Sequence, residues 1–92
     1  MKIYIAGKIT GDPDHKEKFA HAEHQLINDG NIVINPAILP PGFTQEQYMK
    51  VCIPMLDMCE AIYLLKGWET SAGANTEREY AEYTGKIILL EK

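Results

Sequence analysis

Short runs of apolar, β-forming residues occur four times along the chain, and stretches with helical signals separate them. The runs occupy residues 2–6, 31–35, 61–65 and 86–90. Each is bounded by glycine, proline or polar residues, as expected of a buried strand. Alternation of strand and helix predicts a parallel sheet with right-handed crossovers and helices on both of its faces. We therefore expect an α/β fold with about four parallel strands.

Local signals set the expected limits of the first two helices. Asp12 is placed to cap a helix that has Pro13 in its first position, and Gly30 ends that helix. Thr44–Gln47 is a capping box, which predicts the start of a second helix. Pro54 lies inside the apolar pattern of this second helix, and we expect it to kink or split the helix.

The chain is small and acidic. We expect a single domain, residues 1–92, and the chain carries a net charge of −4 with one arginine. This charge argues against binding of a nucleic-acid polymer, which requires a strongly basic face. A chain of this length buries only about two-thirds of its unfolded surface. A homodimer or larger homo-oligomer is therefore expected to complete any substrate-sized cleft.

Hydropathy and cysteine content predict the compartment. No apolar segment approaches the roughly 18 residues of a membrane span, and the first residues lack a signal-peptide pattern. Cys52 and Cys59 match no zinc or redox spacing, so we interpret them as reduced thiols. Both follow the apolar stripe of their helix, which favours a core position over a nucleophilic role. We expect a cytoplasmic protein without a membrane partner.

A ligand is expected at one edge of the sheet. Ligands of parallel sheets bind outside the carboxyl ends of the strands. The loops at that edge are residues 7–14, 35–43 and 66–73. We therefore expect the site residues in these loops and in the first turns that follow them.

A carboxylate stands out on the helix that precedes Gly85. Helical spacing places five residues on one face, which is apolar or small except for the carboxylate at its centre: Gly73, Glu77, Tyr80, Ala81 and Thr84. Burial of an unpaired carboxylate is costly, so Glu77 is either well hydrogen-bonded or functional. Tyr4 is the polar member of an aliphatic first strand, and it is either a core tyrosine or a partner of Glu77.

Two loops have the form of anion sites. Gly7-Lys8-Ile9-Thr10-Gly11 joins a strand to a helix, where backbone amides can hold an anion. It is not a P-loop, because Lys8 follows the first glycine rather than the second. Ser71 and Gly73 offer a second site of this type, and the alternative role of Ser71 is helix capping.

Other candidates are weaker. His15 lies in a first helical turn near the rim and can reach a ligand there. Trp68 lies on the same rim, where it can stack on a base or pack against another subunit. Asp57 points away from the apolar stripe of its helix, and we expect it at the surface. No pattern typical of a metal site occurs.

Two motifs in order resemble the nucleoside 2-deoxyribosyltransferase-like superfamily. The first is Ile3–Gly7 followed by Lys8–Gly11, and the second is Ser71–Ala81 followed by Gly85-Lys86 and the last apolar run. The resemblance covers nearly the whole chain and is greatest to short bacterial and phage members. It implies a small Rossmann-like or flavodoxin-like domain.

The resemblance also assigns roles. In the family, the glutamate of the second motif attacks C1′ of the deoxyribose, and it aligns with Glu77; the tyrosine that hydrogen-bonds it aligns with Tyr4. The transferases carry an aspartate where this chain has Ser71, a departure that is closer to the 2′-deoxynucleoside 5′-monophosphate N-hydrolases. In those enzymes the first loop and this serine bind the phosphate. The substrate-binding residues expected here are Gly7, Lys8, Thr10, Gly11, Ser71 and Gly73.

The expected function is cleavage or transfer of the N-glycosidic bond of a 2′-deoxynucleoside or its 5′-monophosphate, without a metal or organic cofactor. A second family aspartate has no match, because Asp57 falls several residues from its position. This leaves the general acid for the departing base unassigned. The alternatives are a non-catalytic nucleotide-binding module of the same fold and a small interaction protein.

Overall fold

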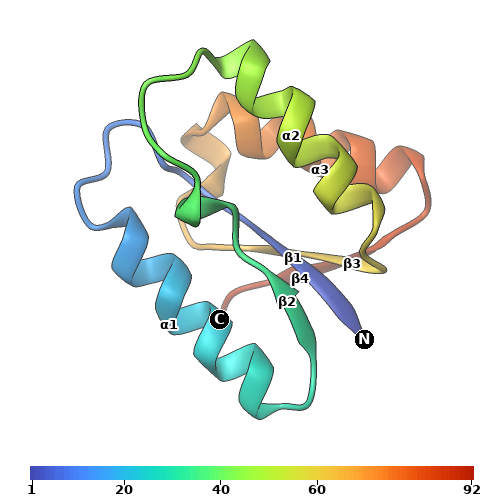
Figure 1. Cartoon of the computed structure of the whole chain (residues 1–92). Helices are drawn as coiled ribbons and strands as arrows, with labels where there is room; N and C mark the ends of the chain where they lie inside the picture. Colours follow the sequence, from blue (N-terminus) through green and yellow to red (C-terminus); the bar gives the residue numbers. More distant parts are fainter.

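The computed structural model describes all 92 residues and contains four strands that alternate with three α-helices (Figure 1). The strands are β1 (Lys2–Ala6), β2 (Ile32–Ile34), β3 (Ala61–Leu64) and β4 (Ile87–Leu90). The helices are α1 (His15–Asn28), α2 (Gln45–Asp57) and α3 (Ala72–Tyr83), with short 3-10 turns at Pro36–Ile38 and Trp68–Thr70. The predicted alternation is confirmed. None of the helices has the length and apolar character required to cross a membrane.

The sheet is parallel throughout, and its strand order is β2-β1-β3-β4. The order reverses between β1 and β3, and clefts in such sheets form outside the strand ends at this reversal. Ala6 at the end of β1 pairs with Leu64 at the end of β3. The loops that follow these two strands therefore leave the sheet side by side.

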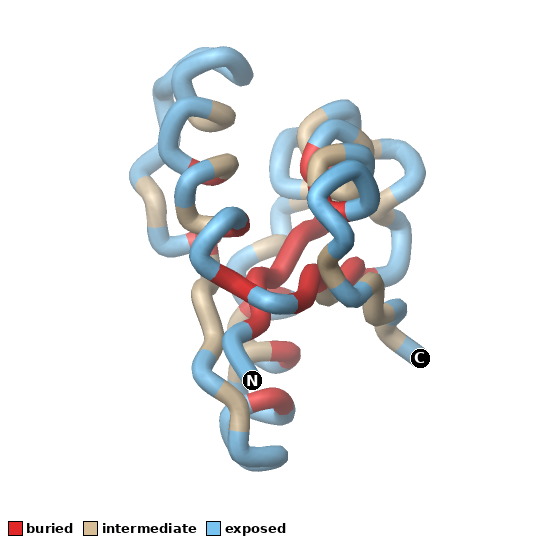
Figure 2. Tube along the Cα trace, turned by 90° about the vertical axis from the view of Figure 1, so that its right-hand side faces the viewer, coloured by how far each residue is buried: buried red, intermediate tan, exposed pale blue.

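Helices cover both faces, as predicted: α1 packs on one face, and α2 and α3 lie together on the other (Figure 1). Strand β1 contributes to both cores because alternate side chains point to opposite faces. Ile3 and Ile5 pack with α1, whereas Tyr4 and Ala6 pack with α2 and α3. Figure 2 shows the buried residues concentrated between these layers.

The start of α1 differs from the expectation. The helix begins at His15 rather than at Pro13, and Asp12 does not cap it. The Asp12 carboxylate instead accepts a hydrogen bond from the Asp14 backbone N–H at 2.9 Å and binds the Lys18 ammonium at 2.8 Å. These two bonds form a local turn that competes with helix at this position.

Helix α2 begins at the predicted capping box. The Thr44 hydroxyl accepts from the Gln47 N–H at 3.1 Å, and the Gln47 side chain accepts from the Thr44 N–H at 2.8 Å. Of the two effects expected at Pro54, the split is wrong because α2 continues through this residue, and the kink stays a prediction. Pro54 and Lys50 are both exposed, so water can bond the Lys50 carbonyl that Pro54 leaves without its donor.

Candidate functional site

A pocket of about 880 Å³ lies at the carboxyl ends of β1 and β3. Its walls come from the loop after β1, the segment after β2 and the first turns of α1, α2 and α3. All of these belong to one chain, and the expected subunit interface stays a prediction. The rim loops predicted from the sequence thus surround a cavity of substrate size.

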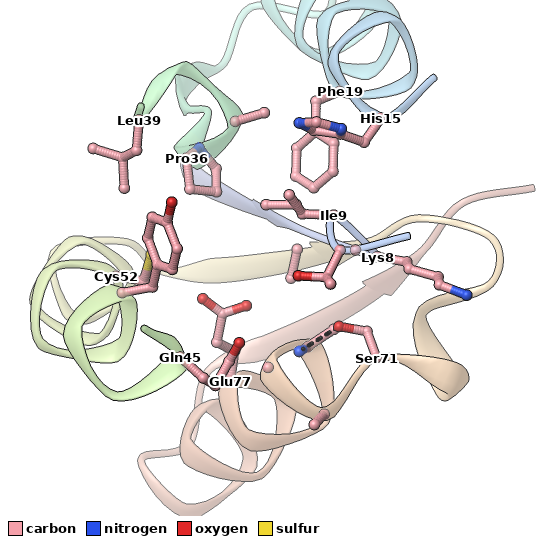
Figure 3. A pocket seen from close by; sticks show the side chains of 18 of the residues that line it. Lys8, Ile9, His15, Phe19, Pro36, Leu39, Gln45, Cys52, Ser71 and Glu77 are labelled. Carbon is pink, nitrogen blue, oxygen red and sulfur yellow. Dashed lines mark hydrogen bonds between the residues drawn. The ribbon is translucent and has the colours of Figure 1, made fainter. Parts of the chain in front are cut away.

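Glu77 and Tyr4 meet at the base of this pocket. Glu77 is 5% exposed and Tyr4 is fully buried, and the Tyr4 hydroxyl donates a hydrogen bond to Glu77 Oε2. No other protein group bonds the carboxylate, and no buried side-chain polar atom lacks a partner, so Oε1 is accessible from the pocket. Figure 3 shows the carboxylate pointing into the cavity. The structure therefore brings together the two residues expected to be catalytic.

Burial sets the charge state of this pair. It raises the pKa of Glu77 to about 7, and the hydrogen bond from Tyr4 acts in the opposite direction. Burial, followed by the neighbouring carboxylate, raises the pKa of Tyr4, so the phenol keeps its proton. Glu77 therefore changes charge near neutral pH, as is common for groups that take part in catalysis.

Cys52 of α2 lines the pocket close to this pair and is 5% exposed. Burial raises the pKa of its thiol, which disfavours the reactive thiolate. The predicted core position is confirmed for Cys52 and also for Cys59.

The loop after β1 contributes three of its four expected residues. Gly7, Lys8 and Thr10 line the pocket, whereas Gly11 does not. Gly11 adopts a φ of +83°, a turn conformation that favours glycine. Gly7 has a packing role, because a Cβ there would lie 3.0 Å from Cβ of Leu65.

The N-terminus of α3 forms the adjoining wall, with Ser71 and Gly73 both lining the pocket. The Ser71 hydroxyl accepts from the Ala74 N–H at 3.2 Å and caps the helix (Figure 3). The N–H groups of Ala72 and Gly73 have no protein acceptor, as expected of a first helical turn. They are available to a ligand anion at the positive end of the helix dipole.

The charge of the pocket differs in sign from that of the whole chain. Lys8, His15 and Lys16 line it, and Glu77 is its only carboxylate. Neither lysine takes part in an ion pair, in a protein of net charge −4. The weaker candidate His15 is thus placed at the site, and Lys16 joins it although the sequence analysis did not single it out.

The wall formed by the segment after β2 and by α2 is mainly apolar. It includes Leu39, Phe43, Tyr48 and Met49. The Tyr48 hydroxyl donates to the Pro40 carbonyl at 2.6 Å, and its ring packs edge-to-face on Phe43 with centroids 5.8 Å apart. The segment lies on the rim as predicted, but no local signal in the sequence marks Tyr48 as the residue that holds it.

Two candidates lie outside the pocket. Trp68 packs under the Arg78 guanidinium, 5.6 Å from ring centroid to Cζ, and does not line the cavity. Asp57 is exposed, as predicted, and accepts a hydrogen bond from the Tyr80 hydroxyl at 2.8 Å. No cluster of three or more histidine, cysteine or acidic residues could hold a metal ion.

A family model described as "Domain of unknown function (DUF4406)" matches residues 1–90. The chain belongs to this family. No curated protein matches the sequence.

Solved structures show the same fold. The CMP N-glycosidase BcmB from Clostridium botulinum matches with a TM-score of 0.70 and 22% identity, over 98% of this chain and 67% of that one. The 2-desoxiribosyltransferase from Leishmania mexicana matches with a TM-score of 0.73 and 24% identity, over 97% of this chain and 62% of that one. The DUF4406 chain thus spans about two-thirds of the length of these structures and shares their flavodoxin-like architecture.

Proposed function

We propose that this DUF4406 protein cleaves or transfers the N-glycosidic bond of 2′-deoxynucleosides or their 5′-monophosphates, with Glu77 as the nucleophile. The observation that carries the proposal is a buried carboxylate with one oxygen bonded by Tyr4 and the other facing a pocket. A carboxylate held in this way without a charged partner destabilises the fold, so its presence favours a chemical role.

The geometry fits a two-step displacement at the anomeric carbon. Glycosidic cleavage passes through an oxocarbenium-like transition state, which a carboxylate below C1′ stabilises and then traps as a glycosyl ester. Oε1 of Glu77 is the attacking atom, while the Tyr4 hydroxyl fixes Oε2 and favours the ionised form. Water then opens the ester in hydrolysis, or a second base opens it in transfer.

The charges of the pocket favour the 5′-monophosphate over the nucleoside. Lys8 and Lys16 are free of ion pairs, and the N–H groups of Ala72 and Gly73 lack protein acceptors. A phosphate placed at the N-terminus of α3 would be bonded by the lysine ammonium groups and the helix amides together. The base would then lie toward the apolar wall around Leu39 and Tyr48.

The names of the structural relatives support glycosidic chemistry as the function class. One is a CMP N-glycosidase and the other a 2-desoxiribosyltransferase. A non-catalytic nucleotide-binding module is the second candidate, and the observation that favours it is the absence of a second carboxylate from the pocket.

The test is an assay of base release from a panel of deoxynucleosides and their 5′-monophosphates, with and without an acceptor base. Chromatography measures the released base. Glu77→Gln keeps the size of the side chain and a hydrogen-bond acceptor for Tyr4 but removes the nucleophile. Glu79→Gln is the matched control, because Glu79 is exposed on the same helix.

Loss of a catalytic nucleophile is expected to reduce turnover by at least about 10³-fold, while Glu79→Gln retains it. Dependence on the acceptor base distinguishes transfer from hydrolysis. Nucleotide affinity without base release in the folded wild type would instead identify the binding module. Equal release by wild type and Glu77→Gln would exclude Glu77 as the nucleophile.

A further inference from the structure

Gln45 is a polar residue of the pocket that the proposed mechanism leaves without a role. It is the first residue of α2, it is exposed, and it lines the pocket. The capping box at this end of the helix is formed by Thr44 and Gln47, so the Gln45 amide is not needed as a cap. The amide bonds no other group of the protein. Both its donor and its acceptor are therefore free to bond a ligand.

The Gln45 side chain reaches from α2 to α3 and lies on Gly73. A Cβ at position 73 would be only 2.5 Å from Nε2 of Gln45, so the amide occupies the space that the missing side chain leaves. Gly73 lies in the first turn of α3 and has no positive φ. The close approach of Gln45, and not the backbone conformation, is thus what favours glycine at this position.

The amide lies beside the place where the sugar of the proposed substrate would bind. Gly73 and Glu77 lie one helical turn apart on the same face of α3, a separation of about 5.4 Å along the axis. The proposed mechanism places C1′ at Oε1 of Glu77 and the 5′-phosphate at the first turn of α3. A deoxyribose that joins these two ends would lie along this face, next to Gln45.

The sugar, rather than the base, is the part of the nucleotide that would meet Gln45. Figure 3 shows Gln45 and Glu77 together on the α3 side of the cavity, with Leu39 of the proposed base wall across from them. In a 2′-deoxynucleoside 5′-monophosphate the 3′-hydroxyl is the one free hydroxyl of the sugar. A hydroxyl both donates and accepts hydrogen bonds, and so does a glutamine amide.

Resting on the proposed function, we infer that Gln45 binds the 3′-hydroxyl of the deoxyribose and that Gly73 provides the space for its side chain. The substrate class is then the free mononucleotide. A nucleotide joined to another through its 3′ oxygen has lost the hydroxyl proton, and it brings a bulky charged phosphate against Gln45.

Nucleotide affinity tests the inference, measured by isothermal titration calorimetry with Glu77→Gln as the parent protein so that no base is released. The ligands are the four 2′-deoxynucleoside 5′-monophosphates and their 2′,3′-dideoxy counterparts, which differ from them only in the 3′-hydroxyl. Gln45→Ala removes the amide from this parent. Glu46→Ala is the matched control, because Glu46 is exposed on the same helical turn and does not line the pocket.

Gln45→Ala is expected to raise Kd for the deoxynucleotides by about 5–10-fold, the loss of one hydrogen bond, and to leave Kd for the dideoxynucleotides within about twofold. Glu46→Ala should change neither. An equal rise for both sugars, a rise confined to one base, or an unchanged Kd would overturn the inference. So would a folded parent that binds none of these nucleotides. Base release by the wild type tests the proposed function separately.

Gly73→Ala reaches the same contact from the other helix. The added Cβ displaces the Gln45 amide without deleting it, and alanine is favourable in a helix. The variant should show the same selective loss of affinity for deoxynucleotides. Because both changes remove one contact, Gln45→Ala combined with Gly73→Ala should bind about as well as either alone. Fully additive losses would show that the two residues act independently and would overturn the role given to Gly73.

Discussion

The two faces of the sheet differ in how they are packed, although β1 contributes to both. On the α1 side, Ile3 and Ile5 contact an apolar core with no buried polar side chain. On the other side, the neighbouring Tyr4 shares its core with Glu77, the single buried charged residue of the chain. One strand thus alternates between a face whose buried side chains are all apolar and a face that holds a buried carboxylate.

The difference in packing identifies Glu77 as a position where the fold is less stable than an apolar side chain would make it. An apolar side chain in place of Glu77 would bury comparable surface without the penalty of desolvating a carboxylate. The raised pKa of Glu77 measures that penalty, since burial is its main cause. Substitutions on the two faces are therefore expected to change stability in opposite directions.

The largest expected effect is on the apolar face. Ile5→Ala removes a fully buried side chain and should lower the free energy of unfolding by about 2–5 kcal/mol. Base release per folded molecule should be unchanged, because Ile5 does not line the pocket. Chemical denaturation measures the first and the chromatographic assay the second. Leu90→Ala, at a side chain that is 60% exposed, is the control and should change stability little.

On the other face, Glu77→Gln should stabilise the protein above neutral pH. The folded state keeps the Glu77 proton between the usual pKa of 4.5 and about 7, a range in which the unfolded chain has released it. The free energy of unfolding therefore falls as pH rises through this range and levels off above it. A pKa difference of this size corresponds to about 3 kcal/mol.

Denaturation of wild type and Glu77→Gln at pH 5, 6, 7 and 8 would measure this slope. The variant should lack the Glu77 contribution and be the more stable protein at pH 8, with Glu79→Gln resembling wild type. A variant less stable than wild type at pH 8 would mean that the carboxylate is a structural group, and the contrast between the faces would then be lost.

A smaller effect is expected from Tyr4→Phe. The Tyr4 hydrogen bond lowers the pKa of Glu77, so its removal should raise that pKa above the present value of about 7. Activity that requires the ionised carboxylate should rise with pH, and the midpoint of this rise should move upward by about one unit, which corresponds to about 1.4 kcal/mol. An NMR titration of the Glu77 side chain follows the same shift independently of activity. An unmoved midpoint would show that Tyr4 only fills space.

The contrast between the faces was partly predictable from the sequence. Spacing within the last helix identified Glu77, and the break in an aliphatic strand identified Tyr4. Both signals come from the pattern of neighbouring residues within one helix or strand, so they can be recognised without knowledge of the tertiary contacts. The expected cap at Asp12 is wrong because Lys18 and the Asp14 N–H bond its carboxylate instead, and the expected split at Pro54 is wrong because α2 continues through this residue.

The apolar wall of the pocket was not predictable in the same way. Tyr48 fits the helical stripe of α2, and nothing in that pattern says that its hydroxyl reaches back to Pro40 or that its ring meets Phe43. Such contacts depend on the path of an irregular loop, which carries no periodic signal. The residues that would contact the base are therefore seen only in the folded chain.

Tyr48→Phe tests this wall and carries the smallest expected effect. The variant keeps the ring contact with Phe43 but loses the hydrogen bond to the Pro40 carbonyl, worth about 0.5–1.5 kcal/mol. Since the bond holds the loop and not Glu77, KM for the nucleotide should rise several-fold, while the pH midpoint of the activity stays in place. Steady-state kinetics across pH separate these quantities. A fall in kcat with KM unchanged would place Tyr48 among the groups that act on the reacting bond, and the division between the binding wall and the chemical face would not hold.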